Sequence, residues 1–526
     1  MSREEQILKI KATENWDCII IGGGASGLGI AVDAASRGFK TVLFEGNDFA
    51  KGTSSKSTKL VHGGVRYMSQ GHIGLVVEAL QERGILAENA KHLFRNQSFV
   101  IPNYNRWKGY YYAIGLKIYD LLSRNLSLGK SELIRGSKVI NILPNLKKAN
   151  LSNGVVYHDG QFDDSRLAIN LAQTAIEQGA TILNYFKVID ILKDKHGKNE
   201  GVIVIDDETG EKYHIKSKCI INATGIFTDR ILKINDPTHK KTVVPSRGIH
   251  LVFDKSLLNS NYAIMIPKTT DGRVLFIIPW HDKVLVGTTD TPVKKKTLDP
   301  VASKSEINFI LQNGAQYFQR PPKKEDILSV FAGLRPLAAP RKNETKTKEV
   351  SRNHKIIVSD SNLVSIVGGK WTTYRKMAEE VVDKSILLHN YKNVRSRTKN
   401  LPIHGNVKET QTFKEKRLNV YGSDAKYIKE FEESNILYSK KIHVNYPFTA
   451  GQIVWAVRYE LARTLEDVLA RRVRLLFLDA KAAIESSRFV AKVMAKELNK
   501  DATWIDEQNE EFKKVAEKYV IDYYYE

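Results

Sequence analysis

Short apolar runs alternate with segments of helical periodicity in the first part of the chain. An apolar run at 16–21 leads into a glycine-rich stretch at 22–27, a helical segment that ends near Arg37, and a second apolar run at 40–44. We therefore predict a strand, a tight turn, a helix and a second strand. This order is typical of a parallel sheet covered by helices.

The rest of the chain changes character twice. Further strands are predicted at 154–158, 216–221 and 363–367, with helices at 73–90, 165–178 and from 370 to about 388. Between 243 and 350 short strands (250–253, 274–279 and 284–286) alternate with turns, which indicates an antiparallel sheet. From about 400 onward, charged segments of helical period (450–461 and 465–485) predict an all-α domain.

These elements predict an α/β protein of three parts. A discontinuous Rossmann-like cofactor-binding domain takes about 15–100, 150–245 and 350–395, so that 1–395 forms the catalytic region. An antiparallel substrate-binding sheet takes about 246–350 with parts of 70–150, and a helical C-terminal domain takes 400–526. A length of 526 residues agrees with several folding units.

Composition narrows the function. The chain has 81 Lys and Arg against 59 Asp and Glu, a net charge of +22, and 42% hydrophobic residues, which excludes a disordered polyampholyte. The positive charge is scattered and no nucleic-acid motif occurs, so we expect anionic substrates or an anionic membrane and no nucleic acid. We expect no secretory signal, spanning helix or metal site, and we expect buried, inert thiols at Cys18 and Cys219.

The glycine-rich stretch has dinucleotide-binding spacing. Gly22 permits the tight turn, Gly24 lets the backbone approach a pyrophosphate, and Gly27 lets the helix pack on the strand. The helix N-terminus favours phosphate, and Glu45 is placed to accept hydrogen bonds from ribose hydroxyls. The hydroxyl-rich loop at 51–59 and the glycine turns at 222–225 and 368–373 follow other predicted strands, so we expect them at the same cofactor.

Six motifs in this order carry a family resemblance. They lie at 22–27, 53–55, 62–67 (HGGVRY), 287–290 (GTTD), 333–337 (GLRPL) and 368–375. They resemble FAD-dependent glycerol-3-phosphate dehydrogenases along about 15–390, and 455–482 resembles the helical C-terminal domain of that family. The resemblance implies non-covalent FAD, oxidation of sn-glycerol 3-phosphate to dihydroxyacetone phosphate, and a membrane quinone as electron acceptor.

The resemblance also implies site residues. The cofactor-binding residues are Gly22, Gly23, Gly24, Ala25, Ser26, Gly27, Glu45, Thr53, Ser54, Ser55, Ser57, Val188, Thr224, Gly225, Gly369, Lys370 and Thr372. The catalytic residues are His62, Arg335 and Lys370, and the substrate-binding residues are Arg66, Tyr67, His250, Arg352 and Thr373. Arginine suits a phosphate dianion, and a histidine of pKa ~6.5 suits removal of the C2 hydroxyl proton. His62 is the expected base and His250 its rival.

Other readings stay open. Relatives that reduce oxygen to hydrogen peroxide often carry an inserted segment for which this chain has no obvious room, so we favour the dehydrogenase over the oxidase. An amine or amino-acid oxidase of the same fold and a non-catalytic flavin module are further alternatives. The chain has no DxDxDG-type loop near its end, which favours a bacterial-type enzyme, peripheral on the cytoplasmic face of the inner membrane. A homodimer is left open.

Overall fold

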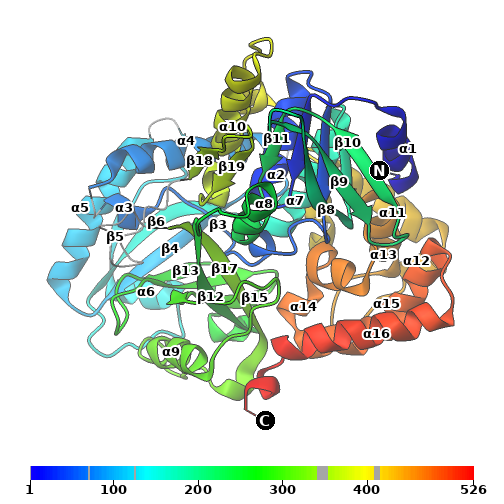
Figure 1. The fold of residues 1–526 in the computed structure, drawn as a ribbon. Helices are drawn as coiled ribbons and strands as arrows, with labels where there is room; N and C mark the ends of the chain where they lie inside the picture. The colour runs from blue at the N-terminus through cyan, green and yellow to red at the C-terminus, as the bar shows by residue number, and fades with distance from the viewer. Residues whose placement is uncertain (1, 69–70, 124–125, 340–353, 408–414, 526) are drawn as a thin grey trace.

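A six-stranded sheet forms the centre of the first domain (Figure 1). The computed structural model describes residues 2–68, 71–123, 126–339, 354–407 and 415–525, without the side chains of Arg66 and Tyr67. The strand order is β18 (Lys355–Val358), β19 (Val364–Val367), β11 (Ile220–Asn222), β1 (Cys18–Ile21), β2 (Thr41–Glu45), β7 (Thr181–Asn184). All neighbours are parallel except the β18–β19 pair. Every residue of β1 is buried, as expected of a parallel strand covered on both faces.

Helices cover one face of this sheet and a smaller sheet covers the other. Helix α2 (Ala25–Ser36) packs between α7 (Asp164–Glu177) and α10 (Tyr374–His389). On the other face, apolar residues of β1 and β2 form one core with the antiparallel strands β8 (Phe186–Lys193), β9 (Asn199–Asp206) and β10 (Lys212–Lys216). Helices α1 (Arg3–Ala12) and α8 (Thr228–Asn235) flank these strands.

The strand predicted at 216–221 is therefore wrong. The predicted range covers the end of β10 and the start of β11, and these two strands belong to different sheets. Between them the Ser217 hydroxyl accepts a hydrogen bond from the Cys219 N–H at 3.1 Å and donates one to the Cys219 carbonyl at 3.1 Å. This local side-chain pairing turns the backbone, and the apolar pattern alone did not reveal it.

A ten-stranded sheet forms the second domain. It has the order β16-β12-β15-β14-β13-β4-β6-β3, with β17 paired to β12 and β5 paired to β6. The strands are β3 (Leu60–Val61), β4 (Arg95–Asn103), β5 (Glu132–Arg135), β6 (Asn153–Gln161), β12 (Val243–Asp254), β13 (Ala263–Ile266), β14 (Leu275–Trp280), β15 (Lys283–Gly287), β16 (Thr291–Pro292) and β17 (Ile327–Ala338). Helices α3 (Val65–Met68), α4 (Ile73–Asn89), α5 (Arg106–Ser123), α6 (Gly136–Ile142) and α9 (Lys304–Ala315) pack around it.

The ten-stranded sheet is wider than predicted. The sequence analysis assigns β3, β6 and most of β4 to the cofactor-binding part, yet these strands pair within the second sheet. Strand β3 follows directly after the hydroxyl-rich loop at 51–59. The two sheets share connecting segments, so the cavity between them is lined from both sides.

Helices make up the C-terminal domain. They are α11 (Ala425–Ser434), α12 (Ile436–Ser439), α13 (Ala450–Tyr459), α14 (Leu475–Leu478), α15 (Ala480–Leu498) and α16 (Ala502–Ala516), with a π-helix at Asp467–Arg472. The prediction of one helix over 465–485 is wrong. The backbone at Arg474 is left-handed, with φ +66°, and this residue separates the π-helix from α14.

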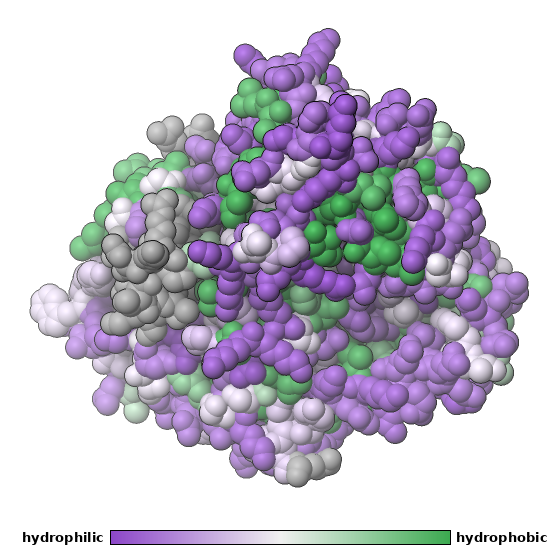
Figure 2. Space-filling view, in the orientation of Figure 1, coloured by the Kyte–Doolittle hydropathy of each residue, from purple (hydrophilic) through white to green (hydrophobic). Residues whose placement is uncertain are grey.

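The surface hydropathy and the two cysteines can be compared with what the composition predicted. Hydrophilic side chains cover much of the face seen in Figure 2, and hydrophobic residues gather over the β8–β10 sheet and along the rim where α5 lies. Among the described helices, none is both long and apolar enough to span a bilayer. Cys18 and Cys219 are buried free thiols with their sulfur atoms 4.0 Å apart, which confirms the expectation of buried thiols without a disulfide framework.

Candidate active site

A cavity of about 690 Å³ lies between the two sheets, at the carboxyl ends of the parallel strands. Turns that follow β1, β2, β11 and β19 line one side of it, and residues of β12 and β17 line the other. Ligands of open α/β sheets bind at this edge because the loops that follow parallel strands converge there.

Steric contacts explain the glycine fingerprint. Gly22 has φ +109°, and a Cβ atom there would lie 2.8 Å from the Ala223 carbonyl oxygen. A Cβ atom at Gly27 would lie 1.8 Å from the Gly22 carbonyl oxygen, so α2 can pack on the turn only with glycine at this position. Gly24 precedes α2 as its N-cap and lines the cavity. The N-terminus of α2 thus lies at the cavity, where the positive end of the helix dipole suits a phosphate group.

Glu45 ends β2 at the cavity wall. Its carboxylate accepts hydrogen bonds from the Gly23 N–H at 2.6 Å and from the Asn47 N–H at 2.9 Å. Burial raises the pKa of this carboxyl, and the two N–H groups oppose that shift. The carboxylate is therefore held rigidly at the cavity, where each oxygen keeps further acceptor capacity for a ribose hydroxyl.

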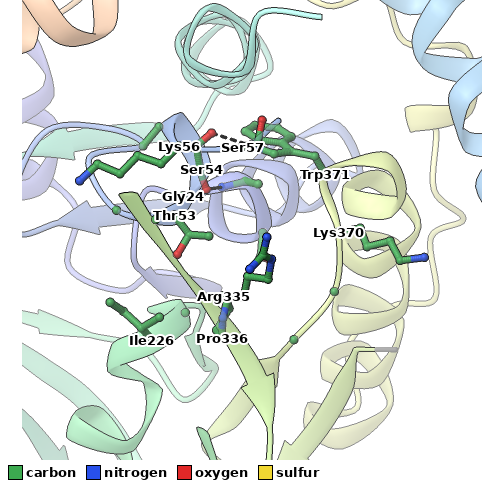
Figure 3. A pocket seen from close by; sticks show the side chains of 18 of the residues that line it. Gly24, Thr53, Ser54, Lys56, Ser57, Ile226, Arg335, Pro336, Lys370 and Trp371 are labelled. Carbon is green, nitrogen blue, oxygen red and sulfur yellow. Dashed lines mark hydrogen bonds between the residues drawn. The ribbon is translucent and has the colours of Figure 1, made fainter. Parts of the chain in front are cut away.

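The hydroxyl-rich loop lies against the helix N-terminus, as Figure 3 shows. The Ser54 hydroxyl accepts a hydrogen bond from the Ala25 N–H at 3.0 Å, and the Trp371 indole donates to the Ser54 carbonyl at 2.9 Å. Thr53 donates to the Leu334 carbonyl at 2.6 Å. These bonds join four segments of the chain, around residues 25, 54, 334 and 371, into one wall of the cavity.

The structure separates the predicted cofactor residues into two groups. Those at the cavity wall are Gly22, Gly24, Ala25, Ser26, Glu45, Thr53, Ser54, Ser57, Val188, Thr224, Gly225, Gly369, Lys370 and Thr372. Those behind the wall are Gly23, Ser55 and Gly27. Gly23 and Gly27 shape the turn. Ser55 is buried and its carbonyl accepts hydrogen bonds from Lys59 and Arg474, so its predicted contact with the cofactor is not supported by the geometry.

Arg335 is the cation that the structure places best for an anionic substrate. It projects from β17, and its guanidinium donates to the Thr289 carbonyl at 3.1 Å and to the Thr288 hydroxyl at 3.2 Å. The side chain is 27% exposed and lines the cavity. A Cβ atom at Gly248 would lie 2.5 Å from this guanidinium, so the glycine makes room for it. The guanidinium also lies 3.5 Å from Asp290 Oδ1, so several contacts hold the fork at the cavity wall.

The other predicted substrate residues are arranged less uniformly. His62, His250 and Lys370 line the cavity, but the Lys370 side chain is directed away from Arg335 (Figure 3). Thr373 is buried outside the cavity wall, and its hydroxyl donates to the Lys370 carbonyl at 3.5 Å, so the structure does not support direct substrate contact. The side chains of Arg66 and Tyr67, and the whole of Arg352, lie outside the described residues.

The two histidines differ in environment. His250 is fully buried, its ring stacks on Phe331 at 4.8 Å, and its Nε2 atom lies 2.9 Å from the Thr58 hydroxyl. Burial, reinforced by the nearby cations of Lys59 and Arg335, holds the pKa of His250 well below its usual range. His62 is only half-buried, and its backbone N–H donates to the Thr372 hydroxyl at 3.2 Å. His250 is thus neutral and poorly basic, which favours His62 as the base.

Several lining residues were missed from the sequence. Lys56 donates to the Leu298 carbonyl at 2.6 Å, and Thr58 bonds to His250. Both belong to the hydroxyl-rich loop, so their position in that loop was the available signal. Gly287 and Gly333 make room for His250 and Lys56, since Cβ atoms there would lie 2.2 Å and 2.9 Å from these side chains. In the described part of the chain no His, Cys, Asp and Glu cluster could hold a metal ion.

Comparisons with known proteins agree with this geometry. Residues 17–374 match the FAD dependent oxidoreductase family, and residues 360–505 match the C-terminal domain of alpha-glycerophosphate oxidase. The mitochondrial glycerol-3-phosphate dehydrogenase of Saccharomyces cerevisiae is 38% identical, over 95% of this chain and 89% of that protein. Its counterpart from Bos taurus is 37% identical, over 100% of this chain and 75% of that protein.

A solved structure gives the same result. The glycerol-3-phosphate dehydrogenase from Bacillus halodurans, complexed with FAD, has a TM-score of 0.80 and 29% identity, covering 98% of this chain and 97% of that one. The predicted fold class and the predicted cofactor, FAD, are therefore confirmed. The glycine turn, the open helix N-terminus and the hydroxyl loop described above fit this dinucleotide. From its sequence, its fold and its cofactor cavity, this chain belongs to the family of FAD-dependent glycerol-3-phosphate dehydrogenases.

Proposed function

We propose that this protein oxidises sn-glycerol 3-phosphate to dihydroxyacetone phosphate and passes the electrons to a membrane quinone. The observation that carries the substrate assignment is the Arg335 guanidinium, which is held at the wall of the same cavity that carries the dinucleotide turn. A planar guanidinium binds a phosphate through two parallel hydrogen bonds. Relatives named for the same substrate support the assignment.

The chain supplies a base and an anion site for this chemistry. FAD, when bound, supplies the acceptor for the hydride that leaves C2 of the substrate. His62 takes the proton of the C2 hydroxyl, and the C–O bond becomes the carbonyl of the product, so charge and atoms balance. Arg335 orients the phosphate, and the buried, neutral His250 stays hydrogen-bonded to Thr58 as part of the wall.

The exposed face of α5 supports a peripheral membrane position. Its residues with large exposed apolar side chains are Trp107, Tyr110, Tyr111, Ile114, Ile118 and Leu121. At 100° per residue these six positions fall on one stripe of the helix, and Gly109, Ala113, Leu116 and Tyr119 on the opposite side are buried. Trp107 is 79% exposed and Leu121 is 76% exposed. Isolated exposed apolar residues are ordinary, but a continuous stripe of six is typical of a surface that meets a membrane or a partner.

The charged residues beside this stripe are cations, which favour a membrane with anionic lipids. Arg106, Lys108 and Lys117 are exposed on the two borders of the apolar stripe. Aromatic and aliphatic residues flanked by cations are the pattern of a helix that lies in the interface of an anionic bilayer. The sequence analysis had not placed this surface in α5. The relatives from Saccharomyces cerevisiae and Bos taurus are named mitochondrial, so the bacterial-type, cytoplasmic placement stays a prediction.

We expect the double substitution Ile114→Glu and Leu121→Glu to weaken binding to phosphatidylglycerol vesicles about tenfold or more. Each buried aliphatic side chain contributes roughly 1.5–3 kcal/mol, and the glutamates add repulsion from the anionic surface. Co-sedimentation at low and high salt measures the effect. Wild-type protein should keep a salt-resistant fraction that the double variant loses, because screening removes only the electrostatic part.

A matched control comes from another exposed leucine on a helix. Leu387 of α10 is 72% exposed and lies outside α5, so Leu387→Glu should leave vesicle binding unchanged. Equal binding of wild type and the Ile114→Glu, Leu121→Glu variant would contradict the assignment of α5. Equal losses in both variants would show a general charge effect instead.

The flavin itself tests the reaction. Anaerobic addition of glycerol 3-phosphate should bleach the flavin absorption, whereas glycerol and glycine should not. In the presence of a soluble quinone, turnover should far exceed turnover with dissolved oxygen, and peroxide formed per substrate oxidised should stay near zero. A peroxide yield close to one with quinone present would establish the oxidase instead, and bleaching by glycine would establish an amino-acid oxidase.

A further inference from the structure

Three arginines of the C-terminal domain reach into the cofactor-binding domain. Arg471 and Arg472 both donate to Asp48, which lies three residues after the end of β2. Arg474 donates to Asp164 at the start of α7. All three side chains are at most 3% exposed. The C-terminal domain therefore contacts the cofactor-binding domain through buried charges whose partners lie next to the cavity.

Asp164 accepts hydrogen bonds both from Arg474 of the C-terminal domain and from residues of the hydroxyl-rich loop. Its Oδ1 atom accepts from Arg474 at 3.1 Å and from the Ser165 N–H at 2.9 Å. Its Oδ2 atom accepts from the Ser57 hydroxyl at 2.7 Å, the Ser57 N–H at 3.1 Å and the Lys59 ammonium at 2.7 Å. One buried carboxylate thus holds both the backbone and the side chain of a residue that lines the cavity.

Arg474 also holds the loop directly. Its NH2 atom donates to the Ser55 carbonyl at 3.1 Å, and its NH1 atom donates to the Ser165 hydroxyl at 2.5 Å. Lys59 donates to the same Ser55 carbonyl at 2.7 Å. Thr58 directly precedes Lys59, and the Thr58 hydroxyl lies 2.9 Å from His250 Nε2. The loop is therefore fixed from behind at 55, 57 and 59.

Both cations adopt a backbone conformation that is costly for long side chains. Lys59 has φ +63° and Arg474 has φ +66°. Such residues persist where the surrounding contacts determine them, and they concentrate at functional sites. Burial lowers the pKa of Lys59, although the Asp164 carboxylate beside it opposes this shift. Burial neutralises lysine more readily than arginine, so we expect Arg474 to be the more durable charged partner of Asp164.

We propose that Arg474 is a positioning residue of the active site. Through Asp164 and the Ser55 carbonyl it fixes the 55–59 backbone, and this sets Ser57 and Thr58 at the cavity wall. The C-terminal domain thereby shapes the cofactor cavity, although none of its described residues lines it. The inference rests on the proposed substrate only for its kinetic readout.

Arg474→Gln tests this role in the full-length holoenzyme. We expect FAD binding to become at least about fivefold weaker and the rate of flavin bleaching by glycerol 3-phosphate, per bound flavin, to fall roughly tenfold. Arg474→Lys should recover part of both, since an ammonium keeps the charge but cannot bond Asp164, the Ser55 carbonyl and the Ser165 hydroxyl together. FAD affinity is measured by titration of the apoprotein followed by flavin fluorescence.

Arg417→Gln is the matched control. Arg417 belongs to the same domain and its side chain is 6% exposed, and its partners, Glu415 and Glu432, also belong to that domain. Its loss should lower the melting temperature while FAD affinity and the rate per bound flavin stay at wild-type values. Equal effects of Arg417→Gln and Arg474→Gln would reduce Arg474 to a structural role and overturn the proposal.

A double-mutant cycle covers the case in which Arg474→Gln does not fold. Arg474→Lys and Ser57→Ala should give non-additive losses of FAD affinity, because both act through Asp164. Additive losses contradict the proposal. If glycerol 3-phosphate fails to bleach wild-type flavin, the proposed substrate is wrong, but the FAD affinities still decide whether Arg474 positions the loop.

Discussion

Gly27→Ala is expected to yield protein without FAD. A Cβ atom at this position would lie 1.8 Å from the Gly22 carbonyl oxygen, and both atoms belong to or adjoin the backbone, so no side-chain rotation relieves the overlap. The helix α2 would have to move away from the turn after β1, and its N-terminus would no longer meet the pyrophosphate. We expect a loss of about 1–3 kcal/mol in the free energy of unfolding as well.

The flavin content of purified protein, taken from the ratio of flavin to protein absorbance, measures the first effect, and thermal unfolding measures the second. Gly74→Ala is the control, because a Cβ atom at this helical glycine meets no atom within 4 Å. It should keep full flavin content and unfold at the wild-type temperature or slightly above, as alanine favours helix. Full flavin content in Gly27→Ala would contradict the packing argument.

Arg335→Ala is expected to reduce kcat/KM for glycerol 3-phosphate by roughly ten- to a hundredfold or more, which corresponds to about 1.5–3 kcal/mol for a charge-assisted hydrogen bond to phosphate. The guanidinium is held by Thr288 and Thr289, so it is preorganised for the anion before substrate arrives. FAD content should stay close to wild type, because the cofactor fingerprint lies on other strands. Steady-state kinetics with a quinone analogue and the flavin absorbance measure the two quantities.

Arg335→Lys separates charge from geometry. An ammonium keeps the positive charge but loses the planar fork, so the loss of kcat/KM should be intermediate. Arg320→Ala removes an exposed arginine that does not line the cavity and should change neither quantity. Wild-type kinetics in Arg335→Ala would show that other groups bind the phosphate.

The local pattern was enough to predict the cofactor-binding elements. The strand at 16–21, the turn and the helix that follows it correspond to β1 and α2. A buried strand and a helix each produce a characteristic pattern of apolar residues within a short window of sequence. The glycine spacing is also local, because it reflects contacts within one turn. Longer elements with ordinary ends, such as α4 and α7, were predicted to within about two residues.

Charge pattern alone failed for the segment 465–485. Three arginines and several acids in a helical period resemble a solvated helix face, yet Arg471, Arg472 and Arg474 are buried against Asp48 and Asp164. Their partners lie hundreds of residues away in the sequence, so no local signal distinguishes a buried ion pair from a surface charge. Helix α5 was not predicted from the sequence either, and its apolar stripe is exposed.

By itself, the sequence determined the order of strands and helices around the dinucleotide turn, the family and the cofactor, and most of the cofactor residues that it predicted line the cavity. Tertiary structure alone decided which neighbours face the cavity: Ser57 does and Ser55 does not, and Thr372 does and Thr373 does not. It also buried His250 against Phe331 while leaving His62 half-exposed. The physical reason is that residue type and spacing record local backbone geometry, whereas side-chain direction and basicity depend on groups that only the folded chain brings together.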